Sequence, residues 1–339
     1  MATAAPHVER SSGGMLAPGR VELPRTHREL VRLATLAASS HNTQPWRFRV
    51  DETRIDILPD FSRRCSAVDP DDHHLFASLG CAAENLLVAA RAIGLVGHIT
   101  FDPTDGGLRI ELEPGAAERS PHVDAIPRRQ CARCEYDGRP IARDVLAELE
   151  EVARIPGSSL LVLTGKRDIE QVAELVAAGN TAQFRDDAWR RELASWIRFD
   201  RREAEARGDG LYGPVMGSPD VPRWLGELFL RFAFSSRAQN RKDIAHIRSS
   251  SAILVFLSDH DDPAHWARAG QSYERVALAA TAAGLHTAFI NQPVEVAPLR
   301  RQLATYLGVG DRRPDLVVRI GHGRAMPRSH RRPVEDVLV

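Results

Sequence analysis

The sequence predicts an α+β protein built from two tandem α/β halves, and three observations support this prediction. A chain of 339 residues is longer than one ordinary domain, so two domains, or one large duplicated domain, are expected. Helical and strand patterns alternate along the chain in two successive series. Residues of one helical segment also recur later at a constant offset, which indicates a fused tandem copy.

The first half is expected to span residues 23–120, after a disordered leader at 1–22. Apolar periodicity and turn residues predict its elements. They are a helix at 27–38, two strands within 46–58 with a turn at Asp51-Glu52, a long alanine-rich helix at 72–93 that ends at Gly94, and strands at 96–101 and 108–112.

The second half is expected to span residues 121–339. Its predicted elements are helices at 142–154, 168–178 and 270–283, and strands at 159–164, 252–257, 286–290 and 315–320. A long insert at about 184–247 interrupts it, with many aromatic residues and with glycines as hinges. Such a segment is either a packed helical excursion or a lid over a ligand.

The duplication is traced residue by residue in two predicted helices. Every matched pair is 190 residues apart: Gly80, Glu84, Ala89, Ala90, Gly94 and Leu95 recur as Gly270, Glu274, Ala279, Ala280, Gly284 and Leu285. The alanines carry little weight, because alanine-rich helices resemble one another easily. The glycines and the glutamate are the more specific signal.

The segment Ser39 to Trp46 reads Ser-Ser-His-Asn-Thr-Gln-Pro-Trp and has no equivalent in the second half, where Ser158-Ser159 run directly into Leu160. Its hydroxyls and amides both donate and accept hydrogen bonds, which suits a flat, neutral ligand with polar edges such as the isoalloxazine ring of a flavin. The alternative is an ordinary loop in which Ser and Asn cap a helix end and Pro45 starts a strand.

A flavin mononucleotide also brings a phosphate, for which guanidinium groups are suitable partners. Two arginine clusters are candidates, although solvated surface is the alternative for each: Arg128, Arg129 and Arg133, and the tail residues Arg328, Arg331 and Arg332. The sequence has neither a Gly-x-Gly-x-x-Gly element after a strand nor a P-loop. Any nicotinamide is therefore expected to bind transiently.

Composition excludes several classes of protein. The 45 basic and 45 acidic residues balance, which argues against a general nucleic-acid or anionic-membrane binder. No apolar run long enough to span a membrane and no secretory signal is present, so a cytoplasmic protein is expected. Four cysteines fit a reducing compartment, and the lone Cys131–Cys134 pair has no second ligand pair, so no metal site is expected.

Four stretches together resemble the nitroreductase-like flavoproteins, and within them the Acg family of actinobacteria. They are Ser-Ser-His-Asn-Thr-Gln-Pro-Trp-Arg-Phe at 39–48, Asp-Pro-Asp-Asp-His-His-Leu-Phe-Ala-Ser-Leu-Gly at 69–80, Trp-Ala-Arg-Ala-Gly-Gln-Ser-Tyr-Glu-Arg-Val at 266–276 with Gln-Pro-Val-Glu at 292–295, and Arg-Arg-Pro-Val-Glu-Asp-Val-Leu at 331–338. The resemblance covers about residues 25–339.

The resemblance implies a nitroreductase-like fold in which the family's homodimer is fused into one intramolecular pseudo-dimer that acts as a monomer. It implies one composite FMN site, since the first half lacks the arginine motif and the second half lacks the amide loop. The implied cofactor-binding residues are Ser39, Ser40, Asn42, Gln44, Arg128, Arg129, Arg133, Ile290, Asn291, Gln292, Arg328, Arg331 and Arg332. Gln130 and Cys131 depart from the family, which usually has a small hydroxyl among these arginines.

The activity implied is FMN-dependent reduction of nitro compounds or quinones with NAD(P)H as transient electron donor. The flavin carries that chemistry, so no catalytic side chain is expected. In the Acg family the resemblance also implies a helical lid that can occlude the flavin. The alternative function is therefore a stress protein that sequesters FMN without turning it over.

Overall fold

A computed structural model describes residues 25–232 and 234–339, so the predicted leader at 1–22 lies outside the described residues. Two four-stranded antiparallel sheets form the framework, which confirms the α+β class. The first sheet has the order β1 (Trp46–Val50), β2 (Arg54–Pro59), β4 (Gly107–Pro114), β3 (Leu95–Asp102). The second has the order β5 (Ser158–Leu163), β8 (Ala252–Ser258), β10 (Arg313–Gly321), β9 (His286–Phe289).

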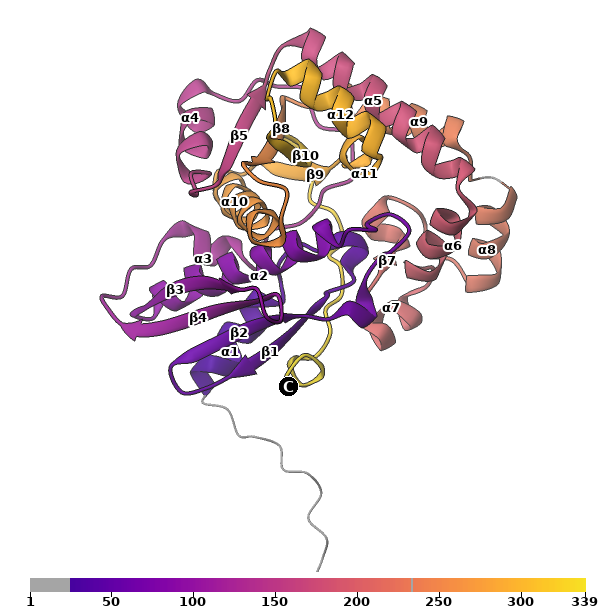
Figure 1. Ribbon diagram of the computed structural model, residues 1–339. Coiled ribbons are helices and arrows are strands. Elements are labelled where there is room, and N and C mark those ends of the chain that lie inside the picture. Colours follow the sequence, from indigo (N-terminus) through magenta and orange to yellow (C-terminus); the bar gives the residue numbers. More distant parts are fainter. Residues whose placement is uncertain (1–24, 233) are drawn as a thin grey trace, which may run out of the picture.

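Two long helices lie between the sheets: α2 (His73–Ala92) packs on the first sheet and α10 (Pro263–Ala282) on the second (Figure 1). Alanine and glycine dominate both helices, which lets their backbones approach closely. In the described residues α2 alone is long and apolar enough to cross a membrane by length and composition, and 78% of that apolar window is buried inside the protein. We therefore assign α2 to the core.

The glycines of the sequence repeat form the contact between α2 and α10. A Cβ atom added to Gly80 would overlap the carbonyl oxygen of Ala267, and one added to Gly270 would overlap that of Ala77. Residues 77 and 267 are 190 apart, as are 80 and 270. The contact is therefore the same from both sides, as in a two-fold symmetric interface.

Most predicted elements occur where the patterns placed them, but three helix boundaries were wrong. Helix α1 is Arg25–Ala34 rather than 27–38, and α5 is Lys166–Arg185 rather than 168–178. Helix α10 begins at Pro263, seven residues before the expected start, because the Asp262 side chain accepts a hydrogen bond from the His265 amide and proline suits the first helical turn. The polar segment around His260 to His265 thus serves as a helix cap.

The insert at 184–247 is mainly helical, and Figure 1 shows it at the side of the two-sheet framework. It contains α6 (Asp187–Trp196), α7 (Arg201–Arg207), α8 (Arg223–Phe232) and most of α9 (Ser236–Arg248), with the short strands β6 (Ile197–Arg198) and β7 (Leu211–Tyr212). Helix α9 packs on α5. Around these elements lie small apolar clusters separate from the main core, as is common beneath long connections.

The remaining helices are α3 (Pro121–Ala125), α4 (Arg143–Val152), α11 (Gln292–Glu295) and α12 (Ala297–Leu307). After β10 the tail returns from the second sheet to the first, where the C-terminus lies (Figure 1). The Phe48 amide donates to Val337 O at 2.7 Å, and the Val339 amide donates to Phe48 O at 3.0 Å. The tail thereby covers the edge strand β1, which would otherwise expose unpaired backbone groups.

Candidate functional site

A cavity of about 600 Å³ opens between the two halves and the insert, within the usual size range of ligand sites. Three kinds of wall surround it. The loop before β1, one face of α2 and the end of β9 supply polar groups. Helices α5 and α9 supply polar and charged groups, and the part of the insert before α9 supplies mostly apolar side chains.

The Ser-Ser-His-Asn-Thr-Gln segment contributes only its first part to this cavity: Ser39, Ser40 and His41 line it. Three residues of the segment have left-handed backbone angles, with φ of 46° at His41 and 53° at both Asn42 and Gln44. Non-glycine residues adopt this conformation rarely and need surrounding contacts to hold it. The backbone twist turns the Asn42 and Gln44 amides away from the cavity.

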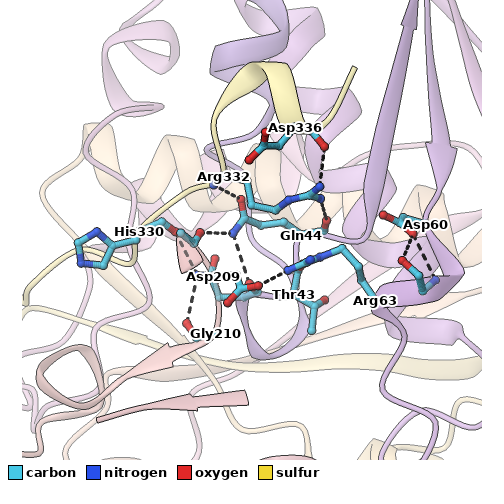
Figure 2. Close-up of polar contacts among 12 residues, drawn as sticks. Thr43, Gln44, Asp60, Arg63, Asp209, Gly210, His330, Arg332 and Asp336 are labelled. Carbon is cyan, nitrogen blue, oxygen red and sulfur yellow. Dashed lines mark hydrogen bonds and ion pairs between the residues drawn. The ribbon is translucent and has the colours of Figure 1, made fainter. Parts of the chain in front are cut away.

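Asn42 and Gln44 instead bind the insert and the C-terminal tail (Figure 2). The Gln44 Nε2 group donates to Gly208 O at 2.7 Å, and Asn42 Nδ2 donates to Gly210 O at 3.1 Å. In the other direction, the Gly210 and Arg332 backbone amides donate to Asn42 O and Gln44 Oε1. We name this set of hydrogen bonds the loop–insert contact. The two amides that the sequence analysis nominated for the flavin are engaged in it.

Buried ion pairs reinforce the loop–insert contact. Asp209, between the two glycines, accepts from Arg63 and, at 2.7 Å, from Arg198 Nη2. The Arg63 Nε group also donates to Thr43 O within the loop itself. Figure 2 shows Arg63 between Thr43 and Asp209. The loop and the insert therefore have a shared set of polar partners.

Removal of the Gln44 amide tests the loop–insert contact. Gln44→Ala leaves the Gly208 carbonyl and the Arg332 amide without buried partners, and we expect the free energy of unfolding to fall by about 2 kcal/mol. Urea denaturation measures this, and limited proteolysis should show faster cleavage near residues 208–218. Gln302→Ala, an exposed residue on α12, is the control. Equal stability of the two variants would contradict the assignment.

Three cationic side chains, Arg133, Lys242 and Arg319, gather at one end of the cavity and line it together with His246. Burial lowers the pKa of Lys242; Asp243 opposes this effect, while Arg133 and Arg319 add to it. Burial, Arg319 and Lys242 lower the pKa of His246 to about 4. Mutual repulsion of this kind marks a place where an anion would be stabilised.

Arg133 is the most available of these cations. Among the described residues its side chain has no hydrogen-bond or ion-pair partner, whereas Arg319 donates to the carbonyls of Ala132 and Cys134 at 2.8 Å. Lys242 donates to Met216 O at 2.8 Å. The nearby Asp243 carboxylate is engaged by Asn180 and Gln239. The Arg133 guanidinium is thus free to bind a ligand.

The other five predicted arginines do not line the cavity, which corrects their sequence-based placement. Arg128 and Arg328 are exposed, and Arg129 is buried in an ion pair of 2.7 Å with Glu274. Arg331 donates to the carbonyls of Thr35, Leu36 and Ala37, and Arg332 donates to Asp336 O. Arg129 and Arg331 satisfy carbonyls that follow α1, a common use of cations at helix ends.

Ile290, Asn291 and Gln292, which the sequence analysis nominated for the cofactor, line the cavity at the end of β9. Asn291 Oδ1 accepts from the Val317 amide at 2.9 Å, so its Nδ2 group faces His74 Nε2 at 3.3 Å. Gln292 Nε2 donates to Asn180 Oδ1 at 3.2 Å, while Gln292 Oε1 is buried with no partner in the described residues. An unpaired buried oxygen beside a cavity is suited to a ligand donor.

Asp69, His73 and His74 offer ligand atoms within 4.8 Å of one another beside this wall. Both Asp69 oxygens accept backbone hydrogen bonds at the start of α2, from His74 and Leu75. His73 Nε2 pairs with Asp315 Oδ1 at 2.9 Å, and His74 Nε2 pairs with the Asn291 Nδ2 group. These groups already have protein partners, so we assign the cluster to the packing of α2.

His41 is the titratable group of the loop that faces the cavity. Burial, with Arg133 and His74 nearby, lowers its pKa to about 4, although Asp69 opposes this. In the unfolded chain a histidine titrates near 6.5. Between these values the unfolded chain binds the additional proton, so stability conferred by neutral His41 is lost as pH falls from about 6.5 to 4.

His41→Gln tests the direction of this pH dependence of stability. We expect the loss of unfolding free energy between pH 7 and pH 4 to be smaller in the variant by roughly 1 to 2 kcal/mol, after allowance for solvent screening. Urea denaturation at several pH values measures the difference. A steeper acid loss in His41→Gln than in the parent protein would contradict the assignment.

The insert forms the apolar wall with residues that include Phe199, Leu225, Phe229 and Phe234. Phe184 and Phe234 stack with ring centroids 4.6 Å apart. Sequence reasoning anticipated aromatic residues there, but it missed the polar lining residues Asn180, Gln183, Lys242, His246 and Arg319. Lys242 and His246 are four residues apart, so their shared helical face was the available signal.

Comparisons with known proteins found relatives that match nearly the whole chain. No protein-family model matches the chain. It is 28% identical over 335 residues to "Putative NAD(P)H nitroreductase Rv3131" of Mycobacterium tuberculosis, an alignment that covers 92% of this chain and 91% of the relative. It is 24% identical over 327 residues to "Putative NAD(P)H nitroreductase acg" of the same organism, with 92% and 94% covered.

Among solved structures, the chain is similar to the nitroreductase NfnB from Mycobacterium smegmatis in complex with NADPH, at 12% identity and a TM-score of 0.41. It is also similar to a Bacteroides fragilis nitroreductase with bound FMN, at 13% identity and a TM-score of 0.39. Each match covers 62% of this chain and 94% of the other. The similarity to the two mycobacterial relatives over nearly the whole chain, together with the motifs at 39–48, 69–80 and 331–338, supports a nitroreductase-like protein of the Acg type.

Proposed function

We propose that the protein is an FMN-dependent NAD(P)H oxidoreductase that holds one FMN per chain in the cavity between its halves. The observation that carries this proposal is the division of the cavity into hydroxyl and amide groups on one side and cations at one end. A neutral ring with polar edges and a phosphate dianion need those two kinds of partner. Both kinds lie in a single cavity.

The residues present fit FMN. Arg133 and Lys242 are nominated for the phosphate, while Ser39, Ser40, Asn291 and the unpaired Gln292 Oε1 are nominated for the ring and its chain. When bound, the flavin accepts hydride from NAD(P)H and reduces a nitro compound or a quinone. The protein groups orient the cofactor, neutralise its phosphate and exclude water from it.

The proposal includes a single site in an intramolecular pseudo-dimer. The α2–α10 contact is equivalent from both sides, yet only the first half carries the Ser-Ser-His-Asn-Thr-Gln segment. One cavity with both polar walls is therefore expected per chain. A cytoplasmic monomer with a flavin-to-protein ratio near one follows from this proposal, and a ratio near two would refute it.

A second candidate function is sequestration of FMN, and the insert favours it. The insert provides the apolar wall of the cavity, and the loop–insert contact holds it in place through Asn42 and Gln44. A segment held in this way acts as a lid. A bulky nicotinamide reaches a flavin only if such a lid opens.

Anaerobic reduction separates the two functions. The purified protein, loaded with FMN, is mixed with excess NADPH while the oxidised flavin band near about 450 nm is followed. Rapid bleaching supports the oxidoreductase, and a persistent band that dithionite still bleaches supports sequestration. Failure to retain any FMN would refute both.

A further inference from the structure

Helix α8 carries an unusual share of the exposed apolar surface. Eight large apolar side chains are exposed in the described residues, and five of them lie on this ten-residue helix, with exposed fractions of 39 to 73%. These five are Trp224, Leu225, Leu228, Phe229 and Phe232. Exposed apolar residues that are concentrated in this way mark an interaction surface.

The five side chains form one stripe along the helix. Trp224, Leu228 and Phe232 follow one another at four-residue intervals, and Leu225 and Phe229 form the adjacent row. The helix packs on the rest of the insert at Gly226, its one buried residue, where an added Cβ atom would overlap the Phe199 ring. Figure 1 places α8 at the outer edge of the insert, in agreement with the exposure of the stripe in the described residues.

The stripe is continuous with the mouth of the cavity. Leu225 and Phe229 are both exposed and part of the cavity lining, whereas Trp224, Leu228 and Phe232 are exposed only. The same helix therefore presents apolar surface to the outside and to the ligand space.

The sequence from α8 to the end of α9 carries a surplus of cations, although the whole chain is neutral. Residues 221–248 contain six cations, Arg223, Arg231, Arg237, Arg241, Lys242 and Arg248, against the two acids Glu227 and Asp243. Arg231, Arg237 and Arg241 are exposed and have no ion-pair partner in the described residues. The balanced total predicted no membrane partner, but the charges are unevenly distributed. Arg223 and Arg248 pair with glutamates, whereas Arg231, on α8 itself, remains an unpaired cation next to the apolar stripe in the described part of the chain.

We propose that α8 docks on an anionic bilayer surface and that the cavity receives its electron acceptor from that bilayer. An amphipathic helix with Trp, Phe and Leu on one face and flanking arginines lies in the interface of an anionic bilayer. A second copy of the chain is the less suitable partner, because two such segments would oppose their positive charges. The part that concerns the acceptor rests on the proposed function and specifies an apolar quinone with a hydrocarbon chain.

Vesicle binding tests the docking without using activity. The full chain is sedimented with vesicles of phosphatidylglycerol and phosphatidylcholine, and with phosphatidylcholine alone. We expect binding to the anionic vesicles, weakened by salt, and at least a roughly tenfold loss of affinity in the double variant Trp224→Glu/Leu228→Glu. Ile93→Glu, which adds one such charge at a side chain 51% exposed at the end of α2, is the control for a new carboxylate at an exposed apolar position away from α8.

A second measurement tests delivery of the acceptor. NADPH-dependent reduction of a quinone embedded in the vesicles should fall about tenfold in the double variant, while that of a short water-soluble quinone stays within about twofold. If the parent protein reduces neither quinone, the proposed function fails while vesicle binding still decides the docking.

Three outcomes would overturn the docking. The first is no binding to anionic vesicles, and the second is equal affinity of the double variant and Ile93→Glu. The third is a dimer in sedimentation velocity that the double variant abolishes, which would assign the stripe to a second copy.

Discussion

Arg133→Ala is expected to weaken FMN binding by roughly 10- to 100-fold, which corresponds to the loss of one charge-assisted hydrogen bond of about 1.5 to 3 kcal/mol. Arg133 lines the cavity and has no side-chain partner in the described residues, so the substitution leaves no protein group newly unpaired. The effect should therefore appear in cofactor affinity and not in stability. Fluorescence titration of the apoprotein with FMN measures it.

Riboflavin makes this prediction specific, because it has the ring and ribityl chain of FMN without the phosphate. Arg133→Ala should change riboflavin affinity by less than about threefold if the guanidinium binds only the phosphate. Arg128→Ala is the control, since Arg128 is exposed and its Nε group donates to Asp124 O at 3.0 Å. Equal losses of affinity for FMN and riboflavin would show that Arg133 contacts the ring or its ribityl chain and not the phosphate. Unchanged affinity for both would show that Arg133 does not bind the cofactor.

Gly270→Ala is expected to lower the free energy of unfolding by about 3 kcal/mol or more, because overpacking at a helix contact forces the backbones apart. The new methyl group would overlap the Ala77 carbonyl oxygen, which is main chain and cannot rotate away. In an uncrowded helix the same change is stabilising by roughly 0.5 to 1 kcal/mol. The sign of the effect therefore tests the contact.

Gly284→Ala is the control for this prediction. Gly284 follows the same helix and has open space around its Cα, with a φ of 75°. The free energy of unfolding of Gly284→Ala should fall by only about 1 to 2 kcal/mol, because the left-handed backbone at this position disfavours a Cβ atom. Urea denaturation of both variants gives the comparison, and soluble yield gives it if Gly270→Ala fails to fold. A Gly270→Ala protein as stable as its parent would show that α2 and α10 are further apart than the structure places them.

Local sequence patterns identified most of the secondary structure for a simple reason. Alternating or helical apolar periodicity reports which side of an element is buried, and it located every strand of both sheets to within a few residues. It failed at the start of α10, where Asp262 and Pro263 outweigh the polar composition of the first turn. The repeated glycines and glutamate of 80–95 and 270–285 also pointed to the duplication, because close helix contacts allow few other residues.

The candidate site was predicted only in part. Ser39, Ser40, Arg133, Ile290, Asn291 and Gln292 line the cavity, but Asn42, Gln44 and five arginines do not. Amide and guanidinium groups can donate hydrogen bonds to a cofactor or to carbonyl groups of the protein. The sequence does not indicate which of these two kinds of acceptor lies close to them in the fold. Lys242 and His246 were missed because the sequence of the insert does not show which of its side chains will face the cavity.

The sequence by itself determined the elements, the internal repeat of residues 80–95 at 270–285, and the supply of polar and cationic side chains, because these depend on short-range periodicity and residue chemistry. The tertiary structure alone decided which of those side chains face one cavity. That choice depends on the left-handed turn at His41 to Gln44, on the tail that brings Arg331 to the carbonyls after α1, and on the packing of α9 against α5. The turn is local, but the groups that hold it, such as the Gly208 and Gly210 carbonyls, are far away in the chain. The tail and α9 also contact residues distant in sequence, so all these partners meet only in the folded protein.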